Sequence, residues 1–167
     1  MNLLFTHRSG GQLWQGSFED VEELLKVPND KISVIGLFAI EYQSLKPNEH
    51  YEIIRGGFND KYWAGEKELK KISEVADSAS DLFSDRIREG KGCLSTCAMG
   101  LNRSGLVSAL TLMKVAGKEP EEAIELVRRL RGIHGGMQPL CNPRFVELIQ
   151  RMRPVVGSKT AWTAWRR

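Results

Sequence analysis

Apolar and polar residues follow two patterns along this chain, one typical of amphipathic helices and one typical of buried strands. Across residues 66–88, apolar side chains recur every three or four positions, which predicts one long helix with a single buried face. Apolar-rich segments at 31–38 and 51–54 predict strands. Residues 12–16 predict a further short strand, and Ser17 is placed to cap a short helix that follows it.

The second half of the chain predicts one more strand and three more helices. A short apolar strand that begins at Gly92 leads into a tight loop, and a helix begins near Ser104. Two further helices are predicted over 120–131 and 143–152, each opened by a proline. The order β-α-β-β-α-β-α-α-α predicts an α/β fold, with helices flanking a central, mostly parallel sheet of about four to five strands.

The same pattern predicts the domain organisation. We expect a single domain over 1–153 and a C-terminal tail over 154–167, because the regular pattern stops near Pro154. The tail carries Trp162 and Trp165. We expect that the tryptophans pack against the domain or that the tail is disordered, and the alternative is a contact with RNA or a membrane surface.

Composition supports a globular protein and narrows its partners. Hydrophobic residues make up 41% of the 167 residues and charged residues 27%, which is ordinary for a folded domain. The net charge of +3 is too small to favour a nucleic-acid partner, but it suits an anionic substrate. No apolar run reaches the roughly 20 residues of a membrane span, so we expect no membrane partner. Three cysteines cannot all pair in disulfides, and the first residues do not resemble a signal peptide. Both observations predict a reducing, cytoplasmic location.

The segment with the clearest chemistry is the loop between the Gly92 strand and the following helix. It reads Cys-Ala-Met-Gly-Leu-Asn-Arg-Ser over 97–104. A loop that enters a helix N-terminus points several backbone N–H groups at one spot, which makes an anion site. Cys97 supplies a soft nucleophile that reacts as the thiolate, and Arg103 supplies a planar fork that can hold two phosphate oxygens. Together they indicate phosphoryl transfer to a cysteine.

The segment resembles the phosphate-binding CX5R loop of cysteine-dependent protein tyrosine phosphatases, in particular the dual-specificity branch. The resemblance implies a protein tyrosine phosphatase-like fold and a phosphocysteine on Cys97, with no cofactor and no metal. It implies that Ser104 donates a hydrogen bond to the Cys97 sulfur. The alternative is that Ser104 caps the following helix, and the two roles are compatible. The residues that would surround the phosphate are Ala98, Met99, Gly100, Leu101, Asn102 and Arg103. One position departs from the family, since Thr96 stands where it usually has a histidine that orients the loop.

Hydrolysis of a phosphate monoester also needs a general acid on a nearby loop. Asp60 is the best candidate, because it follows the 51–54 strand in a glycine-rich loop, 97 − 60 = 37 positions before Cys97. Glu66 is the second candidate, although it also suits a position at the start of the long helix. The alternative for Asp60 is a solvated turn residue beside Asn59.

A few other residues have two interpretations. Cys93 either forms a protective disulfide with Cys97 or is an inert cysteine in a buried strand. Gln138 and Asn142 fall where relatives place a loop over the pocket, so either can position the hydrolytic water, while Asn142 also suits a helix cap.

We therefore predict an enzyme that hydrolyses phosphate monoesters, with a phosphorylated protein as partner. Phosphotyrosine is the expected substrate, with phosphoserine and phosphothreonine as further ones. Inositol phospholipids are disfavoured because no lysine lies between Cys97 and Arg103. The alternatives are a non-catalytic phosphate-binding pseudophosphatase, which Thr96 keeps open, and an RNA 5′-phosphatase.

Overall fold

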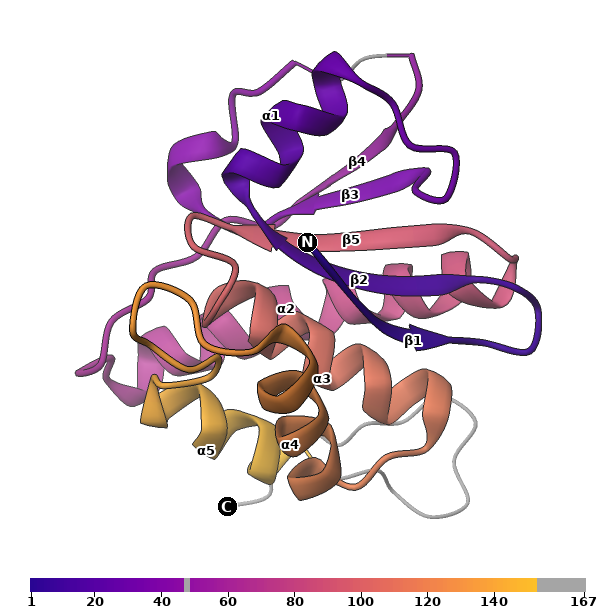
Figure 1. Cartoon of the computed structure of the whole chain (residues 1–167). Helices are drawn as coiled ribbons and strands as arrows, with labels where there is room; N and C mark the ends of the chain where they lie inside the picture. The colour runs from indigo at the N-terminus through magenta and orange to yellow at the C-terminus, as the bar shows by residue number, and fades with distance from the viewer. Residues whose placement is uncertain (47–48, 153–167) are drawn as a thin grey trace.

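The computed structural model describes residues 1–46 and 49–152, in which helices cover both faces of a central sheet (Figure 1). The predicted tail over 154–167 lies outside the described residues. The strands are β1 (Asn2–Thr6), β2 (Gln12–Ser17), β3 (Val34–Leu37), β4 (Glu52–Arg55) and β5 (Gly92–Cys97). The helices are α1 (Phe18–Lys26), α2 (Glu66–Arg88), α3 (Arg103–Ala116), α4 (Pro120–Arg131) and α5 (Pro143–Arg151), and a short 3-10 turn, η1, spans Ile40–Tyr42.

The five strands form one sheet in the order β1-β2-β5-β3-β4. Strands β2, β5, β3 and β4 run parallel, and β1 pairs antiparallel with β2. The predicted α/β fold with a mostly parallel central sheet is therefore confirmed. Because parallel strands end at the same edge, the segments that follow β2, β3, β4 and β5 meet there, with the segment after β5 in the middle.

Both faces of the sheet are buried, which explains the continuous apolar runs of the inner strands. Successive side chains alternate between the two faces, so Cys93 packs with α2–α5 while Leu94 packs with α1. In Figure 1, α1 lies on one side of the sheet and the other helices lie on the opposite side. Within the described part of the chain, no helix is both long and apolar enough to cross a membrane.

The structure differs from the predicted strands at β1 and at β3. Strand β1 was not predicted, because it is an edge strand in which only Leu4 is buried, and it therefore lacks a buried apolar run. The strand predicted over 31–38 is shorter, since the N–H of Ile32 donates to the Asn29 carbonyl in a turn, and β3 begins only at Val34. The predicted bounds of α2 are confirmed, because its helical pattern has no interruption.

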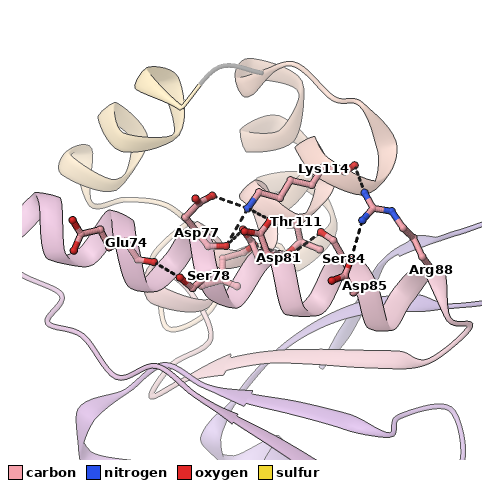
Figure 2. A network of polar contacts seen from close by, with 11 residues as sticks. Glu74, Asp77, Ser78, Asp81, Ser84, Asp85, Arg88, Thr111 and Lys114 are labelled. Atoms are coloured by element: carbon pink, nitrogen blue, oxygen red, sulfur yellow. Dashed lines mark hydrogen bonds and ion pairs between the residues drawn. The ribbon is translucent and has the colours of Figure 1, made fainter. Parts of the chain in front are cut away.

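The far end of α3 is fixed to α2 by a buried lysine (Figure 2). The Lys114 side chain is only 3% exposed, and its Nζ lies 2.6 Å from a carboxylate oxygen of Asp77 and 2.6 Å from one of Asp81. The Arg88 guanidinium donates to the Lys114 carbonyl at 3.0 Å, near the end of α3. The two helices are thus joined by charge as well as by apolar packing.

We expect the substitution Lys114→Ala to lower the free energy of unfolding by about 2–3 kcal/mol, because it leaves Asp77 half-buried without its cation. The cost stays below that of a fully buried pair since Asp81 is exposed to water. Urea denaturation measures it. Lys118→Ala is the matched control, because it removes only an exposed ion pair with Glu122 and should cost less than about 0.5 kcal/mol. Equal losses in the two variants would contradict a structural role for the buried pair.

Candidate active site

The loop predicted to bind phosphate lies at the C-terminal edge of the sheet, as its sequence position requires. Cys97 is the last residue of β5, and α3 begins at Arg103. On the side of β5 away from β2 lie η1, which follows β3, and the loop that contains Asp60, which follows β4. The topology therefore brings three separate segments of the chain to one place.

All the carbonyl groups of the loop between Cys97 and Arg103 accept hydrogen bonds from outside it. Ala98 accepts from the Phe18 N–H (3.2 Å), Met99 from Arg131 Nη2 (3.3 Å), Gly100 from Gln15 Nε2 and Arg131 Nε (both 3.0 Å), Leu101 from the Leu140 N–H (3.3 Å), and Asn102 from the Leu106 N–H (2.8 Å). In a trans peptide the C=O and the next N–H point in opposite directions. The N–H groups of residues 99–103 therefore face the inside of the loop, an arrangement at the start of α3 that suits an anion.

Glycine is required at one position of this loop. Gly100 has a φ of +68°, in the left-handed region that side chains disfavour. A Cβ at this position would lie 2.4 Å from the carbonyl oxygen of Gly16 in β2. The loop can therefore turn against β2 only because Gly100 has no side chain.

The Cys97 thiol lies at the base of the loop and contacts one hydroxyl group. Cys97 is 4% exposed, and its Sγ lies 3.4 Å from Oγ of the fully buried Ser104. The structure thus brings these two predicted site residues together, in a geometry that allows the hydroxyl to donate to the sulfur. Thr96 stands where protein tyrosine phosphatases usually have histidine. Its hydroxyl donates to the Gly36 carbonyl at 2.6 Å and so links β5 to β3.

Arg103 is held by one of its nitrogen atoms. Although the residue is only 8% exposed, Nη1 lies 3.3 Å from a carboxylate oxygen of Glu41 and 3.4 Å from the Phe58 carbonyl. Nε is buried and has no hydrogen-bond partner among residues 1–46 and 49–152. Burying an N–H without an acceptor costs about 1–3 kcal/mol, so this group is a ready donor to a bound anion.

Asp60 lies beside the loop, in contact with two asparagine side chains. One carboxylate oxygen accepts from Asn102 Nδ2 at 3.0 Å, and the other accepts from Asn142 Nδ2 at 2.7 Å. The structure therefore brings the first candidate acid to the loop that contains Cys97.

The second candidate acid has other partners. Glu66 begins α2 and forms ion pairs with Arg144 and Arg151 of α5, at 3.3 and 3.2 Å. The hydrogen bond from Arg151 lowers the pKa of the Glu66 carboxyl, since it favours the charged form. Glu66 thus joins α2 to α5, and of the two candidates only Asp60 contacts the loop.

Both Asn142 and Gln138 were considered as groups that position water. Asn142 is fully buried, and its Oδ1 accepts from the Arg144 N–H at 3.0 Å, so it caps α5 while its Nδ2 binds Asp60. Gln138 is exposed. Nearby, the Tyr62 hydroxyl lies 3.2 Å from the Cys141 sulfur, and this hydrogen bond raises the pKa of Tyr62.

Cys93 cannot form the disulfide considered from the sequence without unfolding β5. Cys93 and Cys97 lie four residues apart in one strand, which separates their Cα atoms by about 13 Å, whereas a disulfide spans less than about 7 Å. Burial raises the pKa of the Cys93 thiol to about 12. The interpretation of Cys93 as an inert strand residue agrees with this geometry.

Three residues that contact the loop or Arg103 were missed from the sequence: Glu41, Gln15 and Arg131. Each lies far along the chain from the residue that it contacts, and none stands in a motif. Only Glu41 could in part have been found from the sequence. A buried guanidinium needs a counter-ion, and Glu41 follows β3, whose C-terminal end lies at the same edge of the sheet as that of β5.

Several solved structures with a similar arrangement of helices and strands are phosphatases. OH1 from the Orf virus, described as a tyrosine phosphatase with triple substrate specificity, has a TM-score of 0.66 at 16% identity, over 90% of this chain and 84% of that one. The PTP-2 phosphatase of Cydia pomonella has a TM-score of 0.66 at 18% identity, over 90% and 88%. Human DUSP28 has a TM-score of 0.58 at 19% identity, over 83% and 88%. The chain has the dual-specificity phosphatase fold.

The predicted protein tyrosine phosphatase-like fold is thereby confirmed. No family model matches the chain, and no curated protein matches it. The similarity to proteins with the phosphatase fold thus lies in the backbone, and the roles of individual residues have to be argued from the contacts of this chain.

We expect Arg131→Ala to weaken the binding of tungstate about tenfold, because the Met99 and Gly100 carbonyls lose a charged donor and the loop loses its fixed orientation. Isothermal titration calorimetry with tungstate measures the change. Arg129 is an exposed arginine of the same helical turn, so Arg129→Ala is the matched control and should stay within about twofold of the original protein. Equal affinity in all three proteins would show that Arg131 does not support the loop.

The raised pKa of Cys93 has a second consequence. Since the folded-state pKa is about 12, the thiol stays protonated from pH 7 to 9 in the folded protein and should not react with iodoacetamide. Cys141, which is half-buried, should be alkylated under the same conditions. Mass spectrometry of the intact protein and of its peptides distinguishes the two sites. Alkylation of both at the same rate, without unfolding, would contradict the burial of Cys93.

Proposed function

We propose that this protein is a phosphatase that hydrolyses phosphate monoesters on proteins through a phosphocysteine on Cys97. Phosphotyrosine is the proposed substrate, with phosphoserine and phosphothreonine as further ones. The observation that supports this most directly is the orientation of the loop over 98–102, whose carbonyl groups all bind donors outside it while the Cys97 thiol lies at its base. The fold supports it too, because the similar solved structures are phosphatases.

In the first proposed step, the Cys97 thiolate attacks phosphorus while the bond between phosphorus and the ester oxygen breaks. The oxygens that remain on phosphorus accept hydrogen bonds from the N–H groups of 99–103 and from Arg103 Nε, which is a donor without a partner among the described residues. Asp60 gives its proton to the departing oxygen. The products are the free alcohol or phenol and a phosphocysteine.

In the second proposed step, water attacks the phosphocysteine and the sulfur–phosphorus bond breaks. The Asp60 carboxylate accepts a proton from the water, and the Ser104 hydroxyl, 3.4 Å from Sγ, stabilises the departing thiolate. Inorganic phosphate leaves, and both Cys97 and Asp60 return to their starting states. No step uses a metal or a cofactor.

The exposed side chains around the loop favour protein substrates over inositol phospholipids and RNA. Trp63, three residues after Asp60, is 80% exposed, and Met99 of the loop is also exposed. The turn that presents the exposed Met137 lies against Met99, since a Cβ on Gly135 would be 3.3 Å from the Met99 methyl group. Exposed apolar side chains suit contacts with peptide side chains, whereas polyanions need a cluster of basic ones. All three cysteines are free, which suits the reducing cytoplasm that we propose as its location.

The wild-type protein should hydrolyse p-nitrophenyl phosphate near pH 6, and Cys97→Ser should reduce kcat by more than about 10³-fold, because the hydroxyl is a far weaker nucleophile. Cys93→Ala serves as the control, since Cys93 lies in the same strand with an inert thiol and should keep most of the activity. Release of p-nitrophenolate is followed at 405 nm after the reaction is made alkaline. A wild-type protein that binds a phosphotyrosine peptide without any turnover would instead favour the pseudophosphatase alternative.

A further inference from the structure

The carboxylate of Asp60 is held on both oxygens by amide groups from two other segments. Asn102 belongs to the loop that contains Cys97, and Asn142 belongs to the segment before α5. Their Nδ2 atoms donate to Asp60 at 3.0 and 2.7 Å. The two asparagines are also joined to each other, because the N–H of Asn142 donates to Asn102 Oδ1 at 3.1 Å. We call Asn102 and Asn142 the amide clamp.

The orientation of both amides is fixed by backbone donors. Oδ1 of Asn142 accepts from the Arg144 N–H at 3.0 Å, and a backbone N–H can only donate, so the opposite atom facing Asp60 must be the NH₂ group. The same reasoning applies to Asn102, whose Oδ1 accepts from the Asn142 N–H. Neither side chain can be flipped without placing two donors face to face. The clamp therefore presents N–H groups to Asp60 from both sides.

The segment that presents Asn142 is itself held in an unusual conformation. Leu140, two residues earlier, has a φ of +54°, which is rare for a bulky side chain. Its N–H donates to the Leu101 carbonyl at 3.3 Å, and its carbonyl accepts from Arg128 Nη2 at 3.0 Å. Its side chain packs against Gly105, where a Cβ would lie 3.1 Å away. Backbone strain of this kind persists only where surrounding contacts enforce it, and here it turns the chain so that Asn142 reaches Asp60.

We infer that the amide clamp of Asn102 and Asn142 holds the general acid Asp60 in place beside the Cys97 loop before substrate binds, so that both asparagines are positioning residues. This inference rests on the proposed function. Each carboxyl oxygen has two acceptor sites, and the clamp uses one on each, which leaves a site for the proton and the ester oxygen. Because Asn102 lies next to Arg103, the residue proposed to bind phosphate and one of the two residues that hold Asp60 are neighbours at the start of α3.

The expected effect depends on the leaving group. Proton donation speeds the departure of a poor leaving group such as phenolate, but it matters little for p-nitrophenolate. Misplacing Asp60 should therefore lower kcat/KM for phenyl phosphate about ten- to a hundredfold, and kcat/KM for p-nitrophenyl phosphate less than about threefold. Asn142→Ser is the variant of choice, because serine still caps α5 but is too short to reach Asp60. The unfolding midpoint should therefore stay close to that of the wild type.

The experiment compares kcat/KM for the two aryl phosphates in four proteins: wild type, Asn142→Ser, Asp60→Ala and the double variant. The expected result is that Asn142→Ser reproduces part of the leaving-group dependence of Asp60→Ala, and that the double variant is no slower than Asp60→Ala alone. A merely structural role for Asn142 would instead slow both substrates equally and would add to the loss in Asp60→Ala. Either of those results, or an Asn142→Ser protein with wild-type values, overturns the clamp.

The same measurements separate this inference from the proposed function. Absence of Cys97-dependent turnover by the wild-type protein rejects the phosphatase itself. Turnover with equal losses on both substrates in Asp60→Ala keeps the phosphatase but removes Asp60 as the acid, and with it the clamp. If the loss in Asp60→Ala depends on the leaving group but the loss in Asn142→Ser does not, only the clamp is rejected.

Discussion

A chain that gathers several N–H groups at one point must turn the matching carbonyl groups away from that point, and buried carbonyls need donors of their own. This constraint organises the surroundings of the Cys97 loop. The donors come from β2, from the start of α1, from the end of α4 and from the segment before α5, so that four separate parts of the fold donate hydrogen bonds to the outside of a single short loop. The conformation of the loop is therefore a property of the whole fold.

Charge is arranged around the same point. Burying a guanidinium is unfavourable unless it is paired with a carboxylate. Arg103 forms such an ion pair through Nη1 with Glu41, whose side chain is exposed to solvent. An exposed carboxylate is screened by water, so it aligns the guanidinium without cancelling its attraction for an anion. Asp60, by contrast, is held on both carboxylate oxygens by the uncharged amides of Asn102 and Asn142.

How much of this could be predicted from the sequence depended on the range of the interactions. The long helix α2 and the loop from Cys97 to Arg103 are encoded locally, by the 3.6-residue period and by residue types at fixed spacing. Strand β1 could not be predicted, since an edge strand with one buried residue has no distinctive pattern. Glu41 and Arg131 could not be predicted either, because their partners are brought to them by the sheet topology. Asn142 was given two alternative roles from the sequence, and in the structure its two side-chain atoms have separate partners.

The ion pairs that join Lys114 to α2 have a consequence for the opposite end of α3. The Cys97 loop leads into the N-terminus of α3, and Lys114 near the C-terminus of α3 is ion-paired with α2, which disfavours fraying of that end. Unwinding of α3 from its C-terminus therefore has to break both ion pairs of Lys114 with α2. We therefore expect the Cys97 loop and the hydrophobic core to unfold together on warming, as one cooperative unit.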